Sequence, residues 1–504
     1  MSSSPPESVT SALTSLRRHK AAGEIEPGEA EHLATLAAQA FLAHYRERGE
    51  SLRDAVRLLC EVATLPNGEA ARAGTAALFP SIIEPLADAF EPAACRVYAS
   101  LFAQVIDFCR TLPEGKPLDL ALRKFGLDGE QDLLERVARI ARIRPFASRE
   151  DDIRKILVLS RVTLGADVAV TSVILDKAKR RFPGAEIVFL ATDGARELFG
   201  GDPRITVHPL NYLRGGTLLG RLLSWLDLVE RVARETHRLR PDESLVIDPD
   251  SRLTQLGLLP LVQDDALYYF FESRSFQSPG VESLGQLTGR WLTRVFGADE
   301  EIFPFVAPPS IDGTWARELT APLRKAGRFV VSLNLGVGEN PRKRLRDPFE
   351  EDLLAMLVAE GATILLDHGA GQEETARVSV LLGRLAALGH RIADLTAGPE
   401  PGAVDAAKVI AWQGGIGRLA ALIAESHLYI GYDSAGQHIA AARDVPTIDI
   451  FTGFTSPMMP KRWRPFGPAR VSLVTVADER RFDPKQTLRE VLRLYREHRA
   501  ASSR

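Results

Sequence analysis

The sequence predicts an α/β protein in which two doubly wound, Rossmann-like units follow an all-helical region. Over the first 150 residues, apolar side chains recur at three- and four-residue steps, as they do along buried helical faces. From residue 153, short apolar runs alternate with helical patterns, which is typical of an open parallel sheet. The alternation stops at the Pro-rich stretch 303–309 and starts again near residue 328, which indicates a second unit.

Size and composition exclude several classes of protein. The chain has 504 residues, 45% of them hydrophobic and 26% charged, which predicts several globular domains. A net charge of -3 provides no general attraction to nucleic acid. Cys60, Cys95 and Cys109 lack metal-site spacing and are expected to be buried thiols. Without a membrane-spanning apolar run or a secretory signal, we expect a cytoplasmic protein.

The first 150 residues are interpreted as an α-helical accessory domain. Leu33, Leu36, Ala37, Ala40 and Phe41 lie on one helical face, and similar patterns follow around residues 101–109 and 133–141. Turn signals such as Pro66-Asn67-Gly68 separate the helices. No residue in this region belongs to a recognisable catalytic constellation.

Residues 151–315 are predicted to form the first α/β unit and residues 325–475 the second. The predicted strands of the first unit span 155–160, 186–190, 205–208 and 244–248. Its main helices are predicted at 167–181 and 218–239. The second unit has strands at 329–334, 362–366, 409–411 and 428–432, and another after Pro446, before a terminal helix in 476–504. Two successive units predict a ligand-binding cleft between them.

The segment Leu428–Phe451 is the most informative part of the second unit. A buried strand leads into a turn of small and polar residues and then into a helix. Backbone N–H groups at such a helix N-terminus favour a phosphate. His438 lies in the first helical turn, where it is able to donate a further hydrogen bond to the same anion. The segment therefore predicts a phosphate-bearing ligand.

Several segments, in order along the chain, resemble glycosyltransferase family 9, the heptosyltransferases of lipopolysaccharide synthesis. The resemblance covers roughly residues 153–470 and is carried by 155–165, 180–187, the turn ending in Lys343, and 421–451 with 463–467. It implies a GT-B fold, in which two Rossmann-like domains face each other across a cleft. The first domain would bind the acceptor, and the second would bind the nucleotide-sugar donor.

The sequence departs from the family pattern at two places. The family turn is Asp-Ser/Thr-Gly-x-x-His, whereas this chain has Asp433, Ser434, Ala435 and Gly436 before Gln437 and His438. The phosphate-facing backbone is expected to be retained. The family also carries a catalytic aspartate directly after Leu-Gly. Here Ala166 occupies that position and Asp167 follows.

The resemblance implies a role for each site residue, and each has a structural alternative. Asp167 would be the general base that deprotonates the acceptor hydroxyl, or else a helix N-cap. Lys343 would contact the leaving diphosphate, or else belong to a solvated basic run with Arg342 and Arg344. His438 and Ser434, with the backbone of Ala435 and Gly436, would hold the distal phosphate, and the alternative for His438 is a polar cap of the helix. Asp433 would belong to the same binding turn or else would orient the turn or His438.

Acidic and basic residues elsewhere supply weaker candidates. Glu373 or Glu374 would accept hydrogen bonds from the ribose hydroxyls, and Glu373 is preferred; a surface glutamate is the alternative. The cluster Lys461–Arg464 either faces an acidic acceptor or forms a solvated turn.

The leading hypothesis is therefore a metal-independent, inverting glycosyltransferase. Its donor would be a nucleotide-diphosphate sugar, with ADP-heptose as the expected co-substrate, and no cofactor is expected. The acceptor would be a cell-surface glycan or lipopolysaccharide-type molecule, which would bring the protein to the inner membrane peripherally. Two alternatives stay open: a protein-modifying enzyme that recognises its acceptor through the helical region, and a catalytically inactive nucleotide-sugar-binding protein. A NAD enzyme is disfavoured because neither unit carries Gly-x-Gly-x-x-Gly after its first strand.

Overall fold

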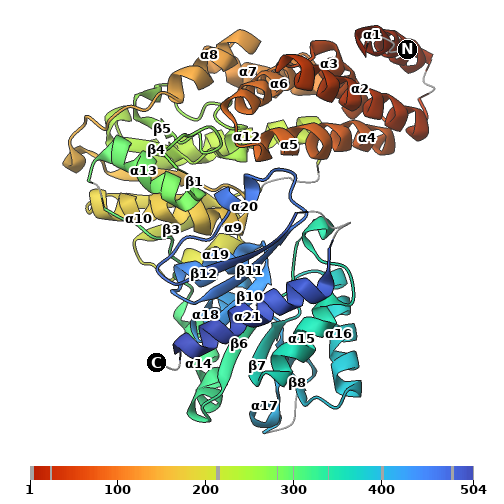
Figure 1. Ribbon diagram of the computed structural model, residues 1–504. Helices are drawn as coiled ribbons and strands as arrows, with labels where there is room; N and C mark the ends of the chain where they lie inside the picture. The colour runs from red at the N-terminus through yellow and green to blue at the C-terminus, as the bar shows by residue number, and fades with distance from the viewer. Residues whose placement is uncertain are drawn as a thin grey trace. The chain divides into compact units, whose positions relative to one another are not determined.

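The computed structural model confirms the predicted fold class, with two parallel sheets after a helical region (Figure 1). It describes residues 5–22, 25–211, 216–280, 282–298, 300–338, 340–398, 402–477 and 482–502. The chain divides into two compact units, one comprising residues 1–162, 210–277 and 294–296 and the other residues 163–209, 278–293 and 297–504. The domain boundaries expected from the sequence differ from this division and stay a prediction.

The N-terminal region is helical, as its periodicity predicts. The turn at Pro66-Asn67-Gly68 marks a helix start, because Asn67 Oδ1 accepts hydrogen bonds from the backbone N–H groups of Glu69 and Ala70. The helices of this region are α1 (Pro5–Ala22), α2 (Pro27–Arg48), α3 (Arg53–Ala63), α4 (Gly68–Leu78), α5 (Glu84–Asp88), α6 (Pro92–Arg110), α7 (Lys116–Lys124) and α8 (Glu130–Ile140).

The first sheet has five strands in the order β3-β2-β1-β4-β5, and every strand pair with a described register is parallel. Its strands are β1 (Lys155–Leu159), β2 (Glu186–Ala191), β3 (Ile205–Pro209), β4 (Ser244–Asp248) and β5 (Tyr268–Phe270). The associated helices are α9 (Leu164–Ala166), α10 (Ser172–Arg181), α11 (Gly194–Phe199), α12 (Leu218–Thr236) and α13 (Leu284–Phe296).

The second sheet has seven parallel strands in the order β12-β11-β10-β6-β7-β9-β8. Its strands are β6 (Phe329–Asn334), β7 (Ala362–Asp367), β8 (Ile392–Asp394), β9 (Val409–Trp412), β10 (Leu428–Tyr432), β11 (Thr447–Thr452) and β12 (Val471–Val476). The helices are α14 (Ser310–Lys325), α15 (Phe349–Ala359), α16 (Gln372–Ala387), α17 (Ala403–Ala406), α18 (Ile416–Ala424), α19 (Ala435–Ala442), α20 (Met459–Arg462) and α21 (Pro484–Ser502).

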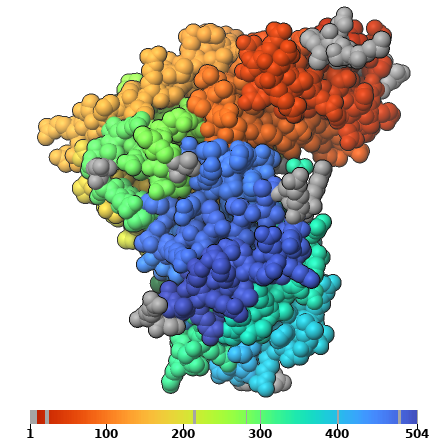
Figure 2. Space-filling view, viewed as in Figure 1, coloured from red at the N-terminus to blue at the C-terminus, as the bar shows by residue number. Residues whose placement is uncertain are grey.

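Helices cover both faces of the second sheet. On one face, α15, α16 and α21 share an apolar core with alternate strand residues such as Ile448 and Ile450. Figure 1 shows α21 running beside α15, and its outer surface forms part of the dark-blue area in the space-filling view (Figure 2). The other face is covered by α14, α18 and α19. Residues that alternate with the apolar set, including Tyr429 and Asp449, therefore point toward α19.

Candidate functional site

The predicted donor-binding residues follow three neighbouring strands of the second sheet. Lys343 comes after β6, Glu373 and Glu374 come after β7, and Asp433 to His438 come after β10. The strand order reverses between β6 and β10, because the chain first builds one side of the sheet from β6 and later returns to its other side. Ligands of open α/β sheets bind at the carboxyl ends of the strands beside such a reversal.

The turn after β10 presents the start of α19. Ser434 is the N-cap residue, with extended backbone angles of φ -152° and ψ -172°, and its side chain makes no capping hydrogen bond. The first N–H groups of a helix have no partner within the helix and attract an anion. The predicted strand, turn and helix are therefore confirmed as structure, and the phosphate they would bind stays a prediction.

Lys343 and Asp433 form the central ion pair of this site. Lys343 Nζ lies 2.5 Å from Asp433 Oδ2 and also donates to the Asp433 carbonyl oxygen at 3.3 Å. The other carboxylate oxygen, Asp433 Oδ1, accepts from Gln437 Nε2 at 2.6 Å. Asp433 is thus fixed between the lysine and the helix. Lys343 keeps 26% of its side chain exposed, so its ammonium group remains accessible to an anion.

The basic residues next to Lys343 in the sequence do not contact Asp433 as Lys343 does. Arg344 binds Asp347 and Glu350, while Arg342 and Arg346 are exposed. Lys343 is therefore distinct from a uniform solvated basic run. In the second basic cluster, Arg462 is buried and donates to the Glu282 carbonyl oxygen at 2.9 Å.

His438 is buried in α19 as a neutral imidazole. Burial lowers its pKa to about 4; Asp433 opposes this shift, and Lys343 adds to it. Its Nε2 lies 3.5 Å from Gln437 Nε2, and its ring meets the Trp463 ring edge-on with centroids 6.1 Å apart. A neutral imidazole still has one N–H donor, so His438 retains the ability to donate to a phosphate.

The Leu164–Gly165 turn and the Asp433–His438 turn lie against each other. A Cβ atom on Gly165 would be 3.3 Å from the Cα of Ala435 and 3.4 Å from Cδ2 of His438. Glycine at position 165 therefore permits the close approach of the two backbones. The structure thus brings together two segments that are far apart in the sequence and were both predicted to belong to the site.

Asp167 lies inside a helix. The helix begins after Thr163, and a π-helical turn spans Asp167–Thr171, with Asp167 at φ -66° and ψ -38°. The N-cap alternative is therefore wrong, because the helix starts three residues earlier than predicted. The Asp167 side chain is 0% exposed, and its Oδ1 accepts from Thr171 Oγ1 at 2.9 Å. Its role as a base stays a prediction.

Glu374, rather than Glu373, organises the loops after β6 and β7. Its Oε1 accepts from the N–H groups of Val337 and Gly338 at 3.0 and 3.2 Å, and its Oε2 accepts from Ala370 N at 3.2 Å. Glu373, the residue preferred from the sequence, is exposed at the start of α16. The ribose contact predicted for Glu373 stays a prediction, and Glu374 is the residue whose geometry shapes the loops.

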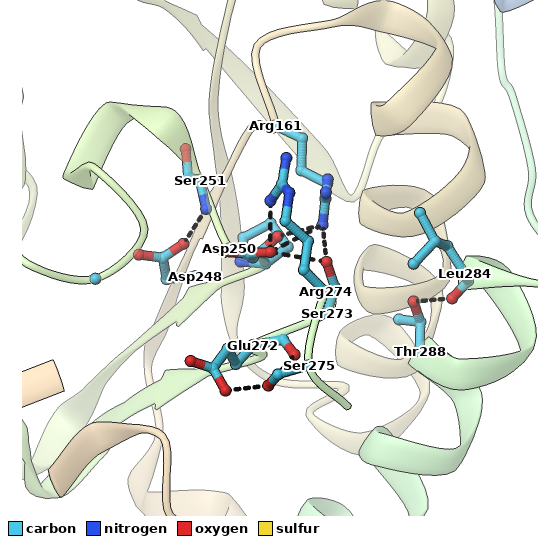
Figure 3. Close-up of polar contacts among 12 residues, drawn as sticks. Arg161, Asp248, Asp250, Ser251, Glu272, Ser273, Arg274, Ser275, Leu284 and Thr288 are labelled. Carbon is cyan, nitrogen blue, oxygen red and sulfur yellow. Dashed lines mark hydrogen bonds and ion pairs between the residues drawn. The ribbon is translucent and has the colours of Figure 1, made fainter. Parts of the chain in front are cut away.

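A second polar cluster lies at the carboxyl ends of β1, β4 and β5. Figure 3 shows Arg161 and Arg274 around the Asp250 carboxylate, with Arg274 Nη1 donating to Asp250 Oδ2 at 2.5 Å. Ser273 Oγ donates to the same oxygen at 2.9 Å. Nearby, Asp248 accepts from Ser251, Thr254 and Tyr268, and burial raises its pKa to about 6. Sequence reasoning missed this cluster, because no motif links these three loops.

The helical region closes a small cavity beside this cluster. The cavity has a volume of about 20 Å³ and is lined from α6 by Cys95 and Tyr98 and from the sheet side by Asp250 and Glu272. Burial raises the pKa of the Cys95 thiol to about 12, and Asp250 adds to the shift. The thiol is therefore protonated at neutral pH. Cys60 and Cys109 are buried, as expected from the sequence, whereas Cys95 is only partly buried.

The described residues contain neither a group of three His, Cys, Asp or Glu side chains arranged to hold a metal ion nor a helix long and apolar enough to cross a bilayer. The candidate site contains an ion pair, a helix N-terminus and a buried imidazole.

Comparison with protein families gives a match over the part of the chain that contains the Asp433–His438 turn. Residues 407–490, which include β10, α19 and β11, match the model of Glycosyltransferase family 9 (heptosyltransferase). This segment is similar to glycosyltransferase family 9. The predicted resemblance is thereby confirmed over the segment that carries Asp433 to His438. No curated protein matches the chain.

Three solved structures are similar to this chain. A family 9 glycosyl transferase from Veillonella parvula is 15% identical, with 69% of this chain and 92% of that chain covered and a TM-score of 0.49. E. coli ADP-heptose lps heptosyltransferase II is 14% identical, with 68% and 99% covered and a TM-score of 0.45. E. coli heptosyltransferase WaaC with ADP is 16% identical, with 68% and 99% covered and a TM-score of 0.44.

Proposed function

We propose that this protein transfers a sugar, with inversion, from a nucleotide-diphosphate sugar to a cell-surface glycan or lipopolysaccharide-type acceptor. The observation that carries the proposal is the Lys343–Asp433 ion pair at the start of α19, whose Asp433 lies inside the segment that matches family 9. ADP-heptose is the proposed donor, since WaaC-type relatives are described with ADP and with an ADP-heptose analogue.

The site contains groups that suit a leaving diphosphate. The ammonium group of Lys343 supplies positive charge, the N-terminal N–H groups of α19 supply oriented donors, and neutral His438 supplies one further N–H. Donors fixed where charge develops stabilise a transition state more than they stabilise the ground state. These residues would hold the diphosphate of the donor and stabilise the negative charge that appears when the glycosidic bond breaks.

Asp167 is the proposed base that removes the proton from the acceptor hydroxyl. Its carboxylate is buried against Thr171 in this conformation, so contact with an acceptor requires the start of the helix to rearrange. The same burial favours a second candidate function, a nucleotide-sugar-binding protein without transferase activity. The two functions predict the same donor affinity and differ in turnover.

Donor binding is tested first by the thermal unfolding of the full chain with ADP, UDP and GDP. A ligand at 100 times its dissociation constant stabilises the folded state by about 2.7 kcal/mol. We expect the midpoint to rise with ADP in the wild type and in Arg342→Gln, but much less in Lys343→Gln. Equal responses of the two variants would contradict the proposed phosphate site.

Turnover then separates the two functions. Release of ADP from ADP-heptose is measured with wild type, Asp167→Asn and a control variant, Asp176→Asn, whose carboxylate pairs with Arg180 in α10. We expect Asp167→Asn to lose about 10²–10⁴-fold in rate while it binds ADP normally, because a general base contributes about this factor. Unchanged turnover in Asp167→Asn would reject the base assignment, and absence of turnover in the wild type would favour the binding protein.

A further inference from the structure

Asp449 is an acidic residue in the interior of the second sheet. It lies in the middle of β11, opposite Gly431 of β10 and Leu473 of β12, and its side chain is 0% exposed. The neighbours Ile448 and Ile450 point into the apolar core on the opposite face. Asp449 therefore faces α19, the helix whose first turn forms the candidate phosphate site.

Neither carboxylate oxygen of Asp449 has a hydrogen-bond partner among the described residues. Burying an ionised carboxylate without partners is very unfavourable, and such a group takes up a proton instead. A protonated carboxylic acid has nearly the same shape as a carboxylate but carries no net charge. The geometry alone therefore favours the neutral form of Asp449.

The groups that face Asp449 come from β10 and from the loop after β6. From β10 and the turn that follows it, Tyr429 and Asp433 act on it, and from the loop after β6, Lys343 does. Burial raises the pKa of Asp449 well above its usual range, the negative charge of Asp433 raises it further, and Lys343 opposes them. Burial also raises the pKa of Tyr429, so that its hydroxyl stays protonated.

We infer that Asp449 carries a proton in the folded protein and that its neutrality keeps Lys343 available to the phosphate groups of the ligand. Lys343 already shares its charge with Asp433. An ionised carboxylate at position 449 would place a second negative charge near this ammonium group and would repel an incoming diphosphate. Asp449 is thus a positioning residue that acts through Lys343, and this inference rests on the proposed donor site.

The protonation of Asp449 is tested without any nucleotide. Infrared difference spectra between wild type and Asp449→Asn, recorded near pH 7, isolate the carbonyl band of a protonated carboxylic acid. We expect this band in the wild type and its loss in Asp449→Asn. The matched control is Asp444→Asn, an exposed carboxylate just after α19, which should leave the band unchanged. A carboxylate band at Asp449 in its place would overturn the inference, whatever the function of the protein.

The positioning role is tested by measuring ADP affinity against pH. Above the pKa of a group that must be protonated, each pH unit weakens binding by up to about tenfold. We expect the dissociation constant of wild type and Asp444→Asn to rise as Asp449 ionises, while that of Asp449→Asn stays within about threefold over the same range. Parallel pH profiles in all three proteins would overturn the role.

The failure of the proposed donor can be told apart from the failure of the positioning role. If ADP binds none of the three proteins, the same pH series is measured with inorganic pyrophosphate, which presents the phosphate groups without a nucleoside. A pH-dependent affinity for pyrophosphate that Asp449→Asn abolishes supports the positioning role and rejects only the nucleotide. No pH dependence with either ligand overturns the inference.

Discussion

Lys343 Nζ and Asp433 Oδ2 lie 2.5 Å apart and connect two strands that are far apart in the sequence. Lys343 follows β6, and Asp433 follows β10, its neighbour in the sheet. The pair therefore lies where the strand order reverses and where ligands of α/β sheets bind. Asp433 is also bound by Gln437 and is buried, whereas the Lys343 side chain is 26% exposed, so the lysine is the partner accessible to a phosphate.

Replacing Lys343 with Gln should weaken the binding of ADP by about 10–100-fold, because a hydrogen bond to a charged group contributes about 1.5–3 kcal/mol. Titration calorimetry measures the affinity. Arg342→Gln is the matched control, since Arg342 is exposed and adjacent. Its affinity should stay within about twofold of the wild type. Similar losses in both variants would mean that general positive charge, and not the position of Lys343, attracts the ligand.

His438 should not titrate near neutral pH. Burial lowers its pKa to about 4, so its imidazole signals in NMR spectra should stay constant from about pH 8 to pH 5.5 and be absent in His438→Gln. Because the unfolded state binds this proton at higher pH than the folded state does, stability should be lost as pH falls from about 6.5 toward 4. The His438→Gln variant should lose less stability over that window. A titration midpoint near 6.5 for His438 would contradict its burial.

The accuracy of the sequence interpretation depends on how much of each element is buried. Long apolar runs such as Phe329–Asn334 were predicted with their observed bounds, because strands of a parallel sheet are buried on both faces. The three-residue strands β5 and β8 were missed because they are too short to show a pattern. The edge strand β12 was missed too, since its alternating burial gives it no continuous apolar run.

The site was predicted unevenly for physical reasons. The turn from Asp433 to His438 is a local feature, so its strand, N-cap and helix follow from neighbouring residues. The contact between Lys343 and Asp433 depends on strand order, which no local pattern encodes. Asp449 was overlooked because one acidic residue in an apolar run does not reveal its burial. Asp167 was assigned to a helix start because the Gly-containing segment 163–166 was interpreted as a turn, whereas Leu164–Ala166 is already helical.

Alanine at position 436 should destabilise the protein through Tyr429. A Cβ atom on Gly436 would overlap the Tyr429 hydroxyl and ring, which occupy the space beneath the first turn of α19. Overpacking of this kind costs about 1–3 kcal/mol in the free energy of unfolding. Denaturant unfolding of Gly436→Ala, Tyr429→Phe and the double variant forms a mutant cycle.

Removal of the hydroxyl relieves part of the overlap, so the double variant should recover part of the stability that Gly436→Ala loses. Strict additivity of the two changes would show that Tyr429 does not cause the strain. Gly383→Ala, at an open position in α16, serves as the control and should not destabilise.

The helical region should depend on Arg136 for its attachment to the sheet that contains β5. Arg136 is 2% exposed, donates to the Gly257 carbonyl oxygen and binds Asp265 Oδ1 at 2.8 Å. Arg139 binds the other oxygen of the same carboxylate at 2.8 Å but is 60% exposed.

Breaking a buried pair leaves an unpaired charge and costs about 3–5 kcal/mol, whereas an exposed pair contributes at most about 1 kcal/mol. Denaturant unfolding should therefore show a large loss of stability for Arg136→Gln and a small one for Arg139→Gln. Limited proteolysis should also release the first 150 residues more readily from Arg136→Gln. Equal stability of the two variants would show that this ion pair does not hold the helical region in place.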